Sequence, residues 1–216
     1  MGNRAVITTK ANFENNGVGV YLHWNGGYDS VSAFLKYCEL KGYRSPDSDC
    51  YGFARLCQVI GNFFGGSTSI GINTVDKLDC DNWDNGVYII EDWKIVDRKY
   101  FKGAEQMNHA MEDMLMEIDE AMPKDEQIGE YIKAKEILAT EVKIGDTVIL
   151  MDYDGKVSKH NVVGFGSGNT FVNGTNVSGL PYVDAYGDYF SHNKNINNYI
   201  RTETVRIVKQ VVDAEE

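Results

Sequence analysis

The sequence has few cysteines and no long apolar run, and both shortages limit what the protein can be. None of its four cysteines belongs to a C-x-x-C pair, and the close ligand spacing of a structural zinc site is missing, so we expect no metal site and reduced thiols. No stretch of about 18 apolar residues is present, which predicts that no helix crosses a membrane. The first residues, MGNRAVITTK, lack the apolar core of a secretory signal, so the expected compartment is the cytoplasm.

Basic residues and catalytic motifs are also scarce. Lys and Arg number 21 against 32 Asp and Glu, which gives a formal net charge of -11. Direct binding of nucleic acid needs a basic surface, so this charge predicts none, whereas an acidic surface suits a basic protein partner. The sequence contains no G-x-S-x-G, Walker or H-E-x-x-H motif. We therefore predict no catalytic residues and no cofactor.

The first hundred residues alternate between strand-like and helix-like segments. The predicted strands cover residues 5–9, 18–24, 69–75 and 86–98. Apolar residues at helical spacing predict two helices, which cover residues 30–43 and 51–64. Asp29 or Ser30 is the expected N-cap of the first helix, and Gly42 is its expected stop. The last strand is expected to turn back at Glu91 and Asp92.

Residues 103–122 form the clearest amphipathic pattern in the chain. Apolar residues recur at intervals of three and four along one face, and they are Met107, Met111, Met114, Leu115, Ile118 and Met122. The other face carries the carboxylates of Glu105, Glu112, Asp113, Glu117, Asp119 and Glu120. The methionine-rich face either packs on a domain core, as most such faces do, or pairs two copies of the chain in a homodimer. Pro123 ends the predicted helix.

The C-terminal part of the sequence is typical of β-structure. The segment IGDTVILMDYDGKV, which starts at Ile144, predicts a strand, an Asp-Gly turn and a second strand, and it resembles the opening of small SH3-like barrels. We therefore predict an α+β protein with three parts. These are a small N-terminal α/β unit over 1–100, an acidic helical connector over 101–138 and a C-terminal SH3-like β unit over 139–216.

The motif NGGYDS, residues 25–30, stands between the second predicted strand and the first predicted helix. Gly26 and Gly27 either supply the positive φ of a tight turn or expose backbone N–H groups that bind phosphate at a helix N-terminus. The motif is similar to the S-G-G-x-D-S loop of the PP-loop ATP pyrophosphatases, with Asn25 in place of the first serine. One hypothesis is therefore a nucleotide-binding or nucleotide-hydrolysing protein. Its ligand site would comprise His23, Trp24, Gly26, Gly27, Asp29 and Ser30.

A wider resemblance covers roughly the first half of the chain. The order VYLHW, GG, helix, YGFARL in a second helix and then a GIG strand is similar to a group of small uncharacterised proteins of bacteriophages and mobile elements. This resemblance implies an accessory protein in the cytoplasm of an infected bacterial host. The resemblance implies no catalytic residue in this sequence.

Charge and resemblance together favour a protein that acts by binding. We expect an anti-defence inhibitor, similar to an anti-CRISPR protein, whose acidic helix occupies the basic groove of a host nucleic-acid-binding protein. Neither nucleic acid nor a membrane is an expected direct partner. The nucleotide site at NGGYDS and a homo-oligomeric structural or assembly component remain the two alternatives.

Overall fold

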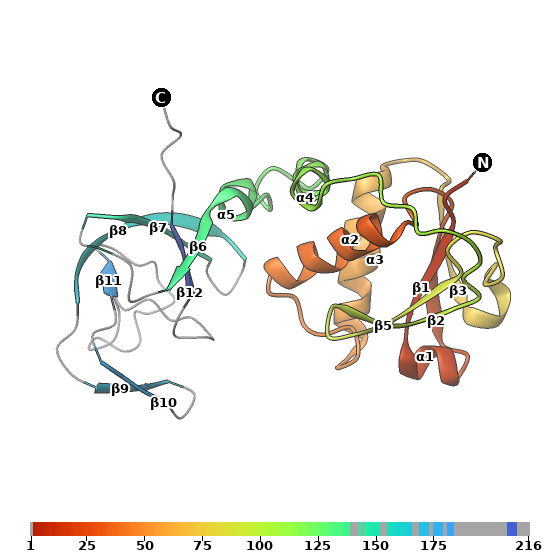
Figure 1. The fold of residues 1–216 in the computed structure, drawn as a ribbon, viewed down its shortest axis with the longest axis horizontal. Coiled ribbons are helices and arrows are strands. Elements are labelled where there is room, and N and C mark those ends of the chain that lie inside the picture. The colour runs from red at the N-terminus through yellow and green to blue at the C-terminus, as the bar shows by residue number, and fades with distance from the viewer. Residues whose placement is uncertain are drawn as a thin grey trace. The chain divides into compact units, whose positions relative to one another are not determined.

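The chain is a mixed α/β protein with two compact units, Met1–Gln127 and Ile128–Glu216. The structure is a computed structural model (Figure 1). It describes residues 2–138, 143, 145–151, 155–165, 169–172, 175–178, 181–183 and 207–210. The segment 101–138, which was expected to form a separate connector, is divided between the two units, and most of it belongs to the first.

A five-stranded sheet forms the centre of the first unit. Its strands are β1 (Ala5–Thr9), β2 (Val18–Leu22), β3 (Ile70–Thr74), β4 (Val87–Glu91) and β5 (Lys94–Lys99), in the order β3-β2-β1-β4-β5. The central strands β1 and β4 run parallel, and the other three pairings are antiparallel. Every residue of β1 is buried, as expected for a central strand covered on both faces. All the strands predicted for this part of the sequence are confirmed.

Helices α2 (Tyr28–Leu40) and α3 (Cys50–Phe64) lie together on one face of the sheet (Figure 1). Asp49 caps α3 by accepting two backbone N–H groups of its first turn. Gly42 follows α2 with a φ of +65°, which confirms its expected role as the stop. The rings of Phe34 and Phe63 meet edge to face at 5.2 Å between centroids and join the two helices.

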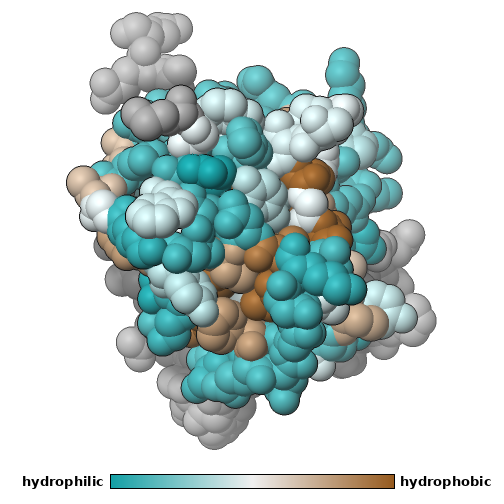
Figure 2. Space-filling view, turned by 90° about the vertical axis from the view of Figure 1, so that its right-hand side faces the viewer, coloured by the Kyte–Doolittle hydropathy of each residue, from teal (hydrophilic) through white to brown (hydrophobic). Residues whose placement is uncertain are grey.

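The opposite face of the sheet is covered by shorter pieces of chain. A turn was expected between the first two strands, but the structure has a short helix there, α1 (Lys10–Glu14), because the Thr9 side chain caps it. Phe13 of α1 and Leu78, which follows the 3₁₀ turn η1 (Val75–Lys77), pack on a small cluster of buried residues on β1 and β4. Figure 2 shows a mainly hydrophilic surface with a few hydrophobic residues gathered near its centre.

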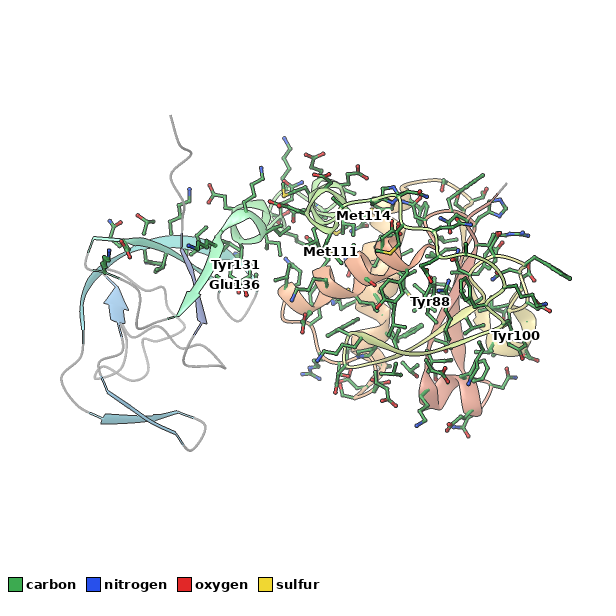
Figure 3. The ribbon with its side chains drawn as sticks, viewed as in Figure 1. Tyr88, Tyr100, Met111, Met114, Tyr131 and Glu136 are labelled. Atoms are coloured by element: carbon green, nitrogen blue, oxygen red, sulfur yellow. The ribbon has the colours of Figure 1, made fainter. Side chains whose placement is uncertain are left out.

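The acidic helix α4 spans Met111–Glu120, so the prediction of a helix from residue 103 is wrong at its start. Asp29 accepts the backbone N–H groups of Asn108 and His109, which turns these amides away from helical hydrogen bonds. Helix α4 packs on α2 and α3 through buried Met114 and its neighbours (Figure 3). The interpretation of the methionine-rich face as part of the core is confirmed for Met114, Leu115, Ile118 and Met122, which are buried. Met107 before the helix and Met111 at its first position are 64 % and 43 % exposed, so the core interpretation does not hold for them.

The second unit contains mostly β-strands in its described residues. It begins with α5 (Gly129–Lys133), followed by β6 (Lys135–Leu138), β7 (Thr147–Met151), β8 (Val157–Phe165), β9 (Asn169–Val172), β10 (Thr175–Ser178), β11 (Pro181–Val183) and β12 (Ile207–Gln210). Five of these strands form a sheet in the order β11-β8-β7-β12-β6, and β9 pairs with β10. Strands β7 and β8 pair antiparallel, which confirms the predicted hairpin, and Asp154 of its expected turn lies outside the described residues. None of the helices in the described residues is both long enough and apolar enough to cross a membrane.

A buried hydrogen bond holds α4 on α2, and its removal tests this packing. The Tyr37 hydroxyl donates to Asp119 Oδ1 at 2.7 Å, and both side chains are buried. Burial and then the Asp119 carboxylate raise the pKa of Tyr37, so the hydroxyl keeps its proton. We expect Tyr37→Phe to lower the free energy of unfolding by about 1–3 kcal/mol, because the buried carboxylate loses a donor.

The measurement is urea unfolding at pH 7. Tyr51→Phe is the matched control, because Tyr51 is 65 % exposed, and it should change stability by less than about 0.5 kcal/mol. Equal stability of the Tyr37→Phe variant and the native protein would contradict the role given to this bond.

Candidate functional site

The diglycine turn lies between β2 and α2, and both of its glycines are buried. A Cβ atom on Gly26 would lie 2.6 Å from the carbonyl oxygen of Asn3, so no larger residue fits there. The positive φ of this turn belongs to Asn25, at 53°, and not to either glycine. The expectation that the glycines supply positive φ is therefore wrong, and close approach of backbone to backbone explains Gly26 instead.

Asp29 lies in the first turn of α2 and is only 6 % exposed. Its Oδ1 accepts the Ser30 N–H at 2.7 Å, and its Oδ2 accepts the N–H groups of Asn108 and His109 at 2.6 and 2.8 Å. Burial acts to raise the pKa of Asp29, but these N–H donors outweigh it and hold the pKa below its ordinary value.

The expected N-cap of α2 needs correction for the same reason. Gly27 occupies the N-cap position and makes no side-chain cap. Asp29 instead fastens the segment 101–110, here called the strap, to the start of the helix. Its carboxylate therefore joins two parts of the chain that are about 80 residues apart in the sequence.

The side chains of Ser30, Asp29 and the strap residue His109 meet at the start of α2, but they do not form a catalytic triad. His109 Nδ1 lies 3.3 Å from Ser30 Oγ and 3.4 Å from Asp29 Oδ2. A triad needs the serine on one ring nitrogen and the carboxylate on the other, whereas a single nitrogen serves both here. Ser30 is also fully buried, so a substrate has no access to its hydroxyl. The sequence analysis missed this contact, because no local pattern connects His109 with residues 29 and 30.

The residues of the nucleotide hypothesis fall into two environments. The glycines, Asp29 and Ser30 are buried, and a Cβ atom on Gly27 would lie 2.7 Å from the Gln106 carbonyl oxygen of the strap. The chain's own backbone thus fills the space beside Gly27 that a phosphate would need. His23 and Trp24 are exposed, with the ring centroids 5.0 Å apart. The structure does not bring the six residues together around one space.

The strap has a second anchor at Glu105. Arg98 of β5 donates to Glu105 Oε2 at 2.6 Å and to the backbone and side-chain oxygens of Asn85. Its guanidinium carbon lies 3.6 Å from the ring centroid of Phe101 and 4.4 Å from that of Tyr88. Glu105 was predicted to bind a partner, but its carboxylate is engaged within the first unit.

The acidic face of α4 is smaller than the sequence predicts. Asp119 is 3 % exposed and faces Tyr37, so its assignment to the partner-binding surface is wrong. The remaining carboxylates of the helix are exposed, and they are Glu112, Asp113, Glu117 and Glu120. None of these four forms an ion pair with a cation in the part of the chain that the structure describes. We call them the carboxylate row.

Three members of the carboxylate row share one face of the helix. At about 100° per residue, Asp113, Glu117 and Glu120 fall within about 60° of one another around the helix axis. Glu112 lies about 80° outside this face. With a rise of about 1.5 Å per residue, the three aligned carboxylates cover about 10 Å of the axis, which gives one negative charge about every 5 Å on average.

The C-terminal half of the carboxylate row costs the helix stability. Asp113 and Glu117 are like charges at spacing i, i+4, which destabilises a helix by a few tenths of a kcal/mol. Glu117 and Glu120 lie near the C-terminal end, where the helix dipole is negative, whereas Glu112 and Asp113 lie in the first turn, where the dipole favours them. The N-cap, Ala110, offers no side-chain hydrogen bond. Packing of the opposite face therefore stabilises α4, and the fold gains nothing from the charges of Glu117 and Glu120.

The described residues hold no group of three or more His, Cys, Asp or Glu side chains placed to bind a metal ion. No protein-family model, curated protein or solved structure matches this chain. The function is therefore inferred from the geometry and charge of the chain itself.

The anchoring role of Asp29 predicts a pH-dependent loss of stability. Its pKa is lowered in the folded state, so its stabilisation is complete above the ordinary carboxyl pKa of about 4 and is lost as the pH falls through the folded value. We expect Asp29→Asn to lower the free energy of unfolding by about 1–3 kcal/mol at pH 7. The difference from the native protein should shrink as the pH falls from about 5 to about 2.

Urea unfolding across this pH range measures both effects. Asp113→Asn removes an exposed carboxylate without a described ion pair, and it serves as the matched control with little change at pH 7. A stability difference for Asp29→Asn that stays constant with pH would show that its charge does not hold the strap.

Proposed function

We propose that the protein acts by binding, and that the carboxylate row of α4 docks on the basic surface of a nucleic-acid-binding host protein. The observation that supports this proposal is the row itself. It consists of four exposed carboxylates on one helix that lack described ion pairs, and two of them, Glu117 and Glu120, cost the helix stability. Residues that weaken their own element without a structural gain are expected at functional sites.

The spacing of the charges supports a nucleic-acid groove as the target. One strand of duplex DNA carries a negative charge about every 3.4 Å along its axis, and the three aligned carboxylates of the row carry one about every 5 Å on average. A groove lined with Lys and Arg to hold phosphates therefore meets a similar charge density on α4. Electrostatic attraction of this kind speeds association and weakens as salt is added.

The resemblance to phage and mobile-element proteins favours a role against host defence. An inhibitor of anti-CRISPR type needs no catalytic residue, because it blocks a groove by occupying it. The second unit is proposed to be a small SH3-like barrel, which is supported by its antiparallel pairings and its five-stranded sheet.

Neutralising the carboxylate row should remove binding and leave the fold intact. The variant carries Glu112→Gln, Asp113→Asn, Glu117→Gln and Glu120→Gln. Its free energy of unfolding should differ from that of the native protein by less than about 1 kcal/mol, because relief at Glu117 and Glu120 offsets the favourable dipole interaction lost at Glu112 and Asp113. The assay is capture of proteins from a nuclease-treated bacterial lysate on the immobilised chain, read by mass spectrometry. The native chain should retain nucleic-acid-binding proteins that the variant loses and that added duplex DNA releases.

A second variant with the same change in net charge provides the control. It neutralises four carboxylates outside α4 that have no described ion pair, namely Glu14, Asp79, Glu91 and Asp92. This control should capture the same proteins as the native chain. If the α4 variant also keeps them, or if the control loses them equally, α4 is not the binding surface.

A further inference from the structure

The two edges of the sheet in the first unit differ in their protection against pairing. The edge strand β5 carries Lys94, Asp97 and Lys99, and its register with β4 shifts between Ile89 and Ile90. Charged side chains and bulges are the common means by which proteins keep edge strands from pairing with other chains. The other edge strand, β3, has the sequence IGINT, with no charge, no proline and an unbroken register with β2.

The backbone of β3 directs N–H and C=O groups toward the outer side of the sheet. The bonds that flank the β2–β3 ladder run from the Val75 N–H to the Gly17 carbonyl at 2.9 Å and from the His23 N–H to the Ser69 carbonyl at 2.8 Å. Because hydrogen-bonded pairs alternate in an antiparallel ladder, the even-numbered residues of β3 direct their N–H and C=O groups away from β2. These residues are Ile70, Ile72 and Thr74, of which Thr74 already donates its N–H to Asn73 Oδ1 at 2.9 Å.

The side chains at this edge are apolar and partly uncovered. Ile72, the central residue of β3, is 55 % exposed. Val18 of β2 is 41 % exposed, and the register places it on the same face of the sheet as Ile72. Helix α3 lies near Ile70 at one end of β3, and the Cδ1 of Ile70 is 3.9 Å from the position of a Cβ on Gly61.

The charge distribution favours a second copy of the chain as the occupant. No charged residue occurs from Leu56 to Val75, which is 20 consecutive residues in a protein of net charge -11. Two such acidic molecules repel each other unless their contact surface is neutral. The stretch that includes β3 provides such a surface, and the strand's central residue, Ile72, would meet its own equivalent.

We propose that the protein forms a homodimer by antiparallel pairing of β3 with β3 of a second copy, around a two-fold axis at Ile72. The two Ile72 residues exchange both backbone hydrogen bonds, and Ile70 lies opposite Thr74 of the second copy. The two sheets become one continuous sheet of ten strands. The contact uses the same edge on both copies, so assembly closes at two, and the protected β5 edges remain outside.

A lysine at the two-fold axis tests the dimer. Sedimentation equilibrium of the full chain should give twice the monomer mass of 24.2 kDa at micromolar concentration. We expect Ile72→Lys to raise the dissociation constant by about tenfold or more, because two like charges then face each other across the new pairing. Val96→Lys on the β5 edge, where Val96 is 49 % exposed, is the matched control and should leave the mass unchanged.

A disulfide across the axis tests the register independently. In a hydrogen-bonded antiparallel pair the Cα atoms lie about 5.5 Å apart, which suits a disulfide. With the exposed Cys50 changed to serine, Ile72→Cys should oxidise to a covalent dimer, whereas Val96→Cys should not. A monomeric native chain, a dimer that tolerates Ile72→Lys, or equal cross-linking of the two cysteine variants would each overturn the proposal.

Discussion

The arrangement of the first unit depends on one buried carboxylate. Asp29 holds the strap through the N–H groups of Asn108 and His109, and the strap fixes where the chain can become helical again. Helix α4 therefore begins at Met111, in position to pack on α2 and α3. The carboxylate is kept ionised by the same donors that it holds, so the charge and the geometry support each other. The acidic surface of the protein is thus positioned by an interaction between a strand-to-helix turn and a segment about 80 residues later.

The elements of the first unit are predictable from the sequence, because each depends on local periodicity and local turn chemistry. The helices α2 and α3 and the strands β1 to β5 follow from apolar spacing and from turn residues such as Gly42. The start of α4 is not predictable in this way, because periodicity continues back to residue 103 and only a distant carboxylate ends it. The burial of Asp119 is also not predictable from the sequence. Asp119 belongs to the acidic pattern and lies at the border of the buried face, and only the fold shows that Tyr37 donates a hydrogen bond to it.

The turn between β2 and α2 suits two different roles, which are anion binding and close packing of backbone against backbone. A helix N-terminus is a ready site for an anion, and the glycines allow close approach of backbone. Here the approach is made by the chain itself, since Gly26 contacts Asn3 and Gly27 contacts Gln106 of the strap. The negative charge near the helix start is supplied by Asp29 rather than by a ligand. These contacts explain every residue of NGGYDS that is buried, and they leave no role there that only a nucleotide could fill.

The two proposed surfaces of the first unit, the carboxylate row and the edge strand β3, differ in charge. The stretch from Leu56 to Val75 has no charge, whereas residues 105–126 contain eight carboxylates and one lysine. The acidic residues of the first unit are therefore concentrated in a different part of the sequence from the neutral edge strand β3. A dimer closed through β3 carries two copies of α4, and two binding sites on one body bind a groove or an oligomeric target more tightly than one site does. The neutral edge would then serve the acidic helix, because pairing at β3 doubles the number of carboxylate rows in one assembly.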